Sequence, residues 1–168
     1  TIGAYAFSSN QNLASIEIPT TVKDIGNGYP VFYRCDALTS INIPNSVKTI
    51  GTFAFVGCER LYNINLPNSL TNIGSTAFSG CESLTVVTIP ESVISIGNMV
   101  FENCNNLKEF NGKYAVDEGR CLVVDGKLVA FALGCGITNY TIPDVVSIVG
   151  VYSMENCETL VSLTIPNS

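Results

Sequence analysis

The sequence feature that most constrains this chain is a repeat of 23 residues. From Leu38 to Asn106 the chain runs through three copies of one unit, which in register read LTSINIPNSVKTIGTFAFVGCER, LYNINLPNSLTNIGSTAFSGCES and LTVVTIPESVISIGNMVFENCNN. Three residue types recur at the same spacing: Pro44, Pro67 and Pro90; Gly51, Gly74 and Gly97; Cys58, Cys81 and Cys104. A fixed period in this range is typical of a solenoid, in which each unit stacks only on its neighbours.

The apolar positions of the unit predict three short segments around a core. Residues 38–43 end with the alternation of a half-buried strand, which Pro44 terminates. Residues 47–50 predict a second, shorter strand, and residues 54–58 predict a single turn of 3₁₀ helix. One unit buries too few side chains to offset the backbone entropy of ordering it, so stacking is obligatory. We therefore expect one buried column formed by Phe55, Phe78 and Phe101.

The repeat extends through the chain, so a single solenoid over residues 1–168 is expected, cut in mid-unit at both ends. A two-residue insertion lies around residues 27–31, and the larger departure is residues 113–136. There, two β-branched runs flank Asp125-Gly126, which predicts a hairpin with strands near 120–124 and 127–132. We expect it to replace the convex side of its own coil and fill part of the core. A structural variant of one coil and a dedicated recognition element remain alternative interpretations.

The cysteines occupy one slot of the repeat rather than a metal-binding pattern. The slot holds Asn10, then Cys35, Cys58, Cys81, Cys104 and Cys157. A small, weakly polar side chain suits the backbone of a turn, and stacked side chains run parallel without converging, so free buried thiols are expected. A zinc site would need close cysteine pairs with histidine, which the chain lacks. Pairing of Cys121 with Cys135 across the hairpin stays open as an alternative.

Composition excludes several classes of function. A net charge of −6 and a pI near 4.5 disfavour nucleic acid and anionic lipid as partners. Pro, Asn or Gly interrupts every apolar run well before the ~18 residues of a membrane span, so no membrane insertion is expected. The absence of histidine removes the commonest general base and the usual catalytic triads. We therefore expect no enzyme activity, no cofactor and no metal.

The role that remains is to present a surface for binding. Residues that flank the inward positions of the first strand form two columns of small, neutral side chains. The candidate binding residues are Ser40, Asn42, Asn63, Asn65, Val86 and Thr88. A face that is merely solvated and binds no ligand is the alternative.

The unit LxxIxIPxSVxxIGxxAFxxC resembles the leucine-rich repeat of the BspA-like bacterial surface proteins, over nearly the whole chain. The resemblance implies a right-handed, β-rich leucine-rich-repeat solenoid with a parallel sheet on its concave side. It also implies a protein that is secreted or held on a cell surface and takes part in adhesion. On this basis we expect an extracellular binding module for a protein or glycan on a host or neighbouring cell. The alternative is a structural spacer within a larger surface protein.

Overall fold

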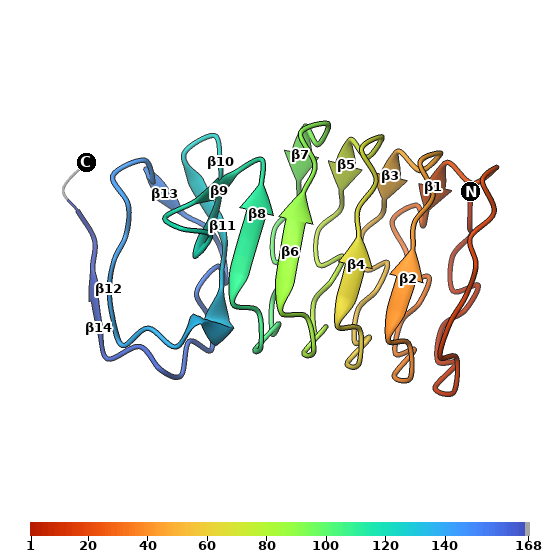
Figure 1. Ribbon diagram of the computed structural model, residues 1–168, viewed down its shortest axis with the longest axis horizontal. Coiled ribbons are helices and arrows are strands. Elements are labelled where there is room, and N and C mark those ends of the chain that lie inside the picture. Colours follow the sequence, from red (N-terminus) through yellow and green to blue (C-terminus); the bar gives the residue numbers. More distant parts are fainter. Residues whose placement is uncertain (167–168) are drawn as a thin grey trace.

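The computed structural model describes residues 1–166 as a solenoid of short parallel strands (Figure 1). One strand of each coil lies in a row that we call the first-strand row. Its members are β2 (Ser40–Asn42), β4 (Asn63–Asn65), β6 (Val86–Ile89), β8 (Glu109–Gly112), β12 (Asn139–Thr141) and β14 (Ser162–Thr164). Parallel pairing joins β2 to β4, β6 to β8 and β12 to β14, so the predicted parallel sheet is present but interrupted between β4 and β6.

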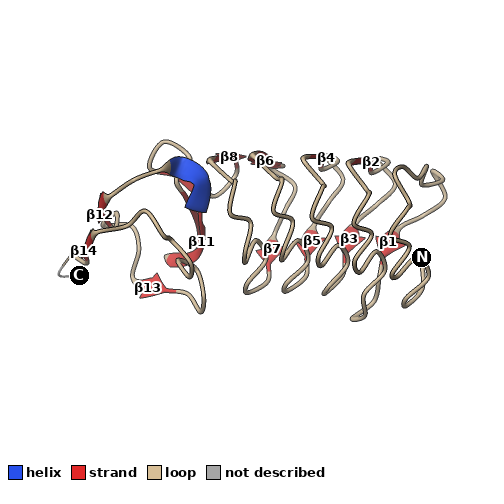
Figure 2. Cartoon of the chain, turned by 90° about the horizontal axis from the view of Figure 1, so that it is seen from below, coloured by secondary structure: helices blue, strands red, loops and turns tan. Residues whose placement is uncertain are grey.

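A second row of two-residue strands lies on the opposite side of the coils (Figure 2). In this second-strand row, β1 (Asp24–Ile25), β3 (Thr49–Ile50), β5 (Asn72–Ile73) and β7 (Ser95–Ile96) form one continuous parallel sheet. Farther along the chain, β13 (Ile148–Val149) takes the same place in its coil. The short second strands predicted from residues 47–50 are thus confirmed.

The third side of each coil is a hydrogen-bonded turn, and here the prediction of 3₁₀ helix was wrong. Phe53 and Gly57 have φ of 62° and 71°, in the left-handed region that no right-handed 3₁₀ helix contains. Because of these left-handed residues, alternate N–H groups of the turn point to the next coil. The N–H of Phe55, for example, donates to the carbonyl of Ala77 over 2.8 Å. Within the described chain, 3₁₀ helix occurs only in η1 (Leu133–Cys135).

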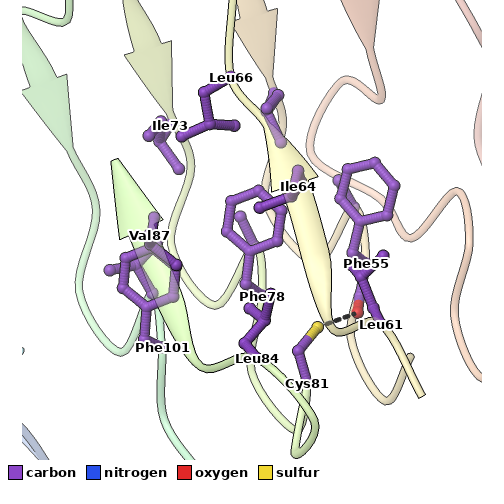
Figure 3. Close-up of a cluster of buried hydrophobic side chains, with 14 of the residues drawn as sticks. Phe55, Leu61, Ile64, Leu66, Ile73, Phe78, Cys81, Leu84, Val87 and Phe101 are labelled. Carbon is purple, nitrogen blue, oxygen red and sulfur yellow. Dashed lines mark hydrogen bonds between the residues drawn. The ribbon is translucent and has the colours of Figure 1, made fainter. Parts of the chain in front are cut away.

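The core is a stack of identical slots, which Figure 3 shows around Phe78. Consecutive rings of the predicted phenylalanine column lie 5.4 and 5.5 Å apart at 7° to each other, so the column is confirmed. It extends to Phe32 and Phe7 in the earlier coils. At the other end Phe101 meets Phe110, tilted by 54°, which ends the parallel stack.

Side-chain hydrogen bonds explain two polar slots of the repeat. The serine two residues after the proline of each of the three regular copies donates to a carbonyl of the preceding coil, as Ser69 does to Val47 over 2.7 Å. The cysteine thiol does likewise, and Cys81 contacts the carbonyl of Phe55 at 3.3 Å. Each slot therefore needs a small donor that reaches the coil before it.

All seven cysteines are free, as expected, and neither Cys121 nor Cys135 forms a disulfide. Four of the five cysteines in the shared slot are buried: Cys35, Cys58, Cys81 and Cys104. Cys157 is only half-buried, which corrects the expectation for that residue. The coil before it carries the hairpin in place of the usual turn, so the phenylalanine carbonyl that meets the other thiols is missing there.

The hairpin consists of β10 (Cys121–Val124) and β11 (Lys127–Phe131), joined by Asp125-Gly126 as predicted. With β9 (Ala115–Val116) it forms a small sheet, and β11 pairs in parallel with β13. It thus takes the place of the second strand of its coil, opposite the first-strand row.

The two faces of the hairpin pack on different hydrophobic clusters. Leu122 and Val129 belong to the large cluster of the preceding coils. Val123, Leu128 and Phe131 belong to a smaller cluster with the coils that follow. The hairpin therefore fills the interior of the solenoid, as predicted, and separates its core into two parts.

Truncating one ring of the column tests the packing. Phe78→Ala removes a fully buried ring between two others, and we expect it to lower the free energy of unfolding by ~3 to 5 kcal/mol in urea melts. Phe53→Thr, at an exposed ring on the turn surface, is the control, and a change within ~0.5 kcal/mol is expected. A loss below ~1 kcal/mol for Phe78→Ala would contradict the packed column.

The repeated glycine gives a second test. A Cβ on Gly74 would lie 2.4 Å from the backbone nitrogen of Thr52, so Gly74→Ala forces neighbouring coils apart. We expect a destabilisation of roughly 1 to 3 kcal/mol. Gly3 fills the same slot of the first coil with nothing within 4 Å of its Cβ position. Gly3→Ala is therefore expected to leave thermal stability unchanged, and equal effects of the two substitutions would rule out close coil contact as the reason for the glycine.

Thiol reactivity tests the burial of the cysteines. Burial raises the pKa of Cys58 and of Cys104 to about 12, and the thiolate is the reactive form. Iodoacetamide at pH 8 is therefore expected to spare the five buried thiols of the folded protein and to label Cys135 and Cys157 first. Peptide mass spectrometry gives the order of labelling, and labelling in denaturant shows that every site is competent. Early labelling of Cys81 would contradict the packing described here.

Candidate binding face

The six residues predicted to bind all lie on the exposed face of the first-strand row. Ile41 in β2 and Ile64 in β4 are buried, and their neighbours on either side point to solvent. Parallel pairing places Ser40 beside Asn63 and Asn42 beside Asn65. In β6, Val86 and Thr88 continue the same two columns. The alternation of the strand therefore puts all six side chains on one surface.

The structure brings four of the six together around a shallow hollow of about 530 Å³. Asn63 and Asn65 lie on one side of it, and Val86 and Thr88 lie on the other. The hollow is where the backbone ladder between β4 and β6 is interrupted. Ser40 and Asn42 lie one strand away and do not line it.

Two residues of the hollow escaped the sequence analysis. Asn68 and Pro90 line it from the turn that follows the first strand. Their signal was present, because the proline recurs in every regular unit and Asn68 follows one. The outward column also continues past Val86 to Glu109, its partner in β8, so the surface becomes charged one coil farther on.

The hollow offers hydrogen bonding without charge. Each asparagine amide provides donors and an acceptor, the threonine hydroxyl provides both, and the valine provides apolar contact. No general base or nucleophile is among the residues that line it, within the described part of the chain. The side chains around the hollow thus supply hydrogen-bond donors, hydrogen-bond acceptors and one apolar contact.

Among residues 1–166, no group of three or more His, Cys, Asp or Glu side chains is placed to hold a metal ion. None of the described helices has the length and apolar character needed to cross a bilayer.

A buried polar network links the hairpin coil to β12. The hydroxyl of Tyr140 donates to Oδ2 of Asp117 over 2.7 Å and lies 2.8 Å from the thiol of Cys121. Burial raises the pKa of Tyr140, and its two hydrogen-bond partners raise it further. Burial also raises the pKa of Cys121 to about 11. Both groups therefore stay protonated at neutral pH, and the network acts as a structural link.

Comparison with known proteins agrees with this geometry. The family described as the BspA type leucine rich repeat region matches residues 28–118 and 128–168, in 6 copies. The gap between the two matches falls on β10 and the turn of the hairpin. A search of curated proteins finds no match to the chain.

Several solved structures share the fold. A leucine-rich repeat protein of T. pallidum is 28% identical, with a TM-score of 0.65 over 97% of this chain. A leucine-rich cell surface protein from Faecalibacterium prausnitzii A2-165 is 21% identical, with a TM-score of 0.76 over 98% of this chain. A leucine-rich repeat protein from Bacteroides ovatus is 22% identical, with a TM-score of 0.64 over 99%. The chain spans 61%, 54% and 64% of the length of these three proteins, respectively.

The match to the family covers most of the chain and includes the slots whose packing and hydrogen bonds were described above. That pattern has a physical basis in the contacts between coils. These are the phenylalanine column, the hydrogen bonds of the serine and the thiol, and the close approach of the backbone to the glycine. The chain belongs to the BspA-type leucine-rich repeat family.

Proposed function

We propose that this chain is an extracellular binding module that engages a protein or glycan through the face of the first-strand row. The observation that carries the proposal is the hollow at the interrupted ladder between β4 and β6, lined by four of the six predicted residues. Family membership supports a binding or structural repeat module. The cell-surface description of the F. prausnitzii protein, whose fold this chain shares, suggests the location.

The rigidity of the face supports binding by small polar side chains. Asn63 and Asn65 stand on a strand that is hydrogen-bonded to β2 on one side, and their inward neighbour Ile64 is held in the core. A ligand therefore meets amides whose backbone is already ordered, and less entropy is lost on binding. Each amide that forms a good hydrogen bond contributes about 0.5 to 1.5 kcal/mol.

A structural spacer is the second candidate function. It is favoured by the same regular packing, since a stack of coils is a stiff rod whether or not its face is used. The absence of aromatic side chains among the six predicted residues also favours it, because the strongest contacts of protein interfaces are enriched in Tyr, Trp and Arg.

A binding screen distinguishes the two functions. Biolayer interferometry against a panel of host matrix proteins and immobilised glycans is expected to give at least one ligand. Replacing both Asn63 and Asn65 with Ala is then expected to weaken its binding about tenfold, equivalent to ~1.4 kcal/mol.

The matched control is Asn45→Ala. Asn45 occupies the same slot as Asn68, one coil earlier, but lies outside the hollow. It is expected to keep full affinity. If no ligand of the panel binds above background, the result favours the structural spacer instead.

A further inference from the structure

A second surface of the molecule gathers exposed aromatic rings, which the first-strand face lacks. Tyr5, Tyr29 and Phe53 lie at the turns of the first three coils with 58%, 56% and 40% of their surface exposed. The rings of Tyr5 and Tyr29 are 6.0 Å apart, centroid to centroid. We call these three residues the aromatic patch.

The stacking of coils explains why the three rings lie on the same side of the solenoid. The N–H of Tyr5 donates to the carbonyl of Pro30, and the N–H of Phe32 donates to the carbonyl of Ala54. Tyr5, Pro30 and Phe53 therefore fill one slot in successive coils. Tyr29 lies beside Tyr5 and directly follows the two-residue insertion that distinguishes this coil from its neighbours.

A groove of about 370 Å³ begins next to the patch and runs along the second-strand row across β3 and β5 to β7, the row labelled in Figure 1. Thr49, Asn72 and Ser95 lie along it. Glycines of the same row, Gly26, Gly51 and Gly74, also line the groove. Because they have no side chains, the groove is shallow and open. Gly28 and Thr52 line it too, and Tyr29 and Phe53 follow them directly in the chain.

The groove is neutral and rich in hydroxyl and amide groups. None of the residues that line it, all within the described chain, carries a charge. Asn72 donates to the Ser95 hydroxyl over 2.7 Å, which leaves the hydroxyl proton of Ser95 to donate elsewhere. Asn72 also accepts from Thr71 over 2.7 Å, so its amide is oriented before any ligand arrives.

We propose that the aromatic patch and this groove together form a binding site for a neutral oligosaccharide chain. The C–H faces of sugar rings carry partial positive charge and pack on the negative faces of aromatic rings. Sugar hydroxyls donate and accept, as the hydroxyl and amide groups along the groove do. A row of strands with a regular spacing suits a polymer of repeating units. The net charge of −6 disfavours anionic polysaccharides.

Affinity gel electrophoresis tests the site with defined probes. The neutral probes are galactomannan, xyloglucan, mixed-linkage β-glucan and dextran, and the anionic comparators are hyaluronan and polygalacturonate. We expect at least one neutral polysaccharide to retard the protein. The variant carrying Tyr29→Ser and Phe53→Thr takes the residues found in those slots of the second repeat copy, Ser75 and Thr76, and is expected to lose at least tenfold in affinity.

Two controls separate this site from other surfaces. Tyr62→Thr removes a tyrosine that is equally exposed but lies outside the patch, at a slot where the flanking units have threonine, and it is expected to retain full retardation. The variant with alanine at Asn63 and Asn65 is also expected to retain it. The proposal is overturned if no neutral probe retards the protein, if only anionic probes do, or if the asparagine variant rather than the aromatic variant abolishes the effect.

Discussion

Backbone hydrogen bonds between successive coils are the constraint on which the whole structure depends. On the strand rows the N–H groups reach the preceding coil, as Gly51 does to Ile25, and on the turn side they reach the following one, as Phe55 does to Ala77. A strand of two residues can make few bonds by itself, so only stacking satisfies the buried backbone. This explains why the regular coils keep one period and why the two longer ones return to the same register after residues 27–31 and 113–136.

The side-chain slots follow from that backbone arrangement. Coils this close leave no space for a Cβ at Gly74 and bring Phe78 into parallel contact with the rings before and after it. Ser69 and Cys81 each donate to a carbonyl of the preceding coil, those of Val47 and Phe55. The residue type in each slot of the repeat is thus determined by contacts between coils rather than by conformational preferences within one coil.

Spacing alone predicted the strands, the phenylalanine column, the buried thiols of the regular coils and the hairpin. It did not predict the turn geometry, because left-handed φ at Phe53 and Thr76 has no signature in the residue type. It placed the six candidate binding residues on one face, but the interruption between β4 and β6 that groups four of them depends on backbone position. The aromatic patch was missed because the insertion before Tyr29 hides which slots Tyr5 and Phe53 share.

The division of the core by the hairpin has a consequence for cooperativity. In a solenoid, stability passes from coil to coil through nearest neighbours, so loss of order at one end can spread step by step. Here the side chains on either side of β10 and β11 belong to two clusters, and Cys135 of η1 also packs against both. Opening of the final coils removes the smaller cluster and leaves the larger one covered by Leu122 and Val129. The hairpin thus marks a boundary between two units of local unfolding, and the proposed binding surfaces both lie on the coils of the larger cluster.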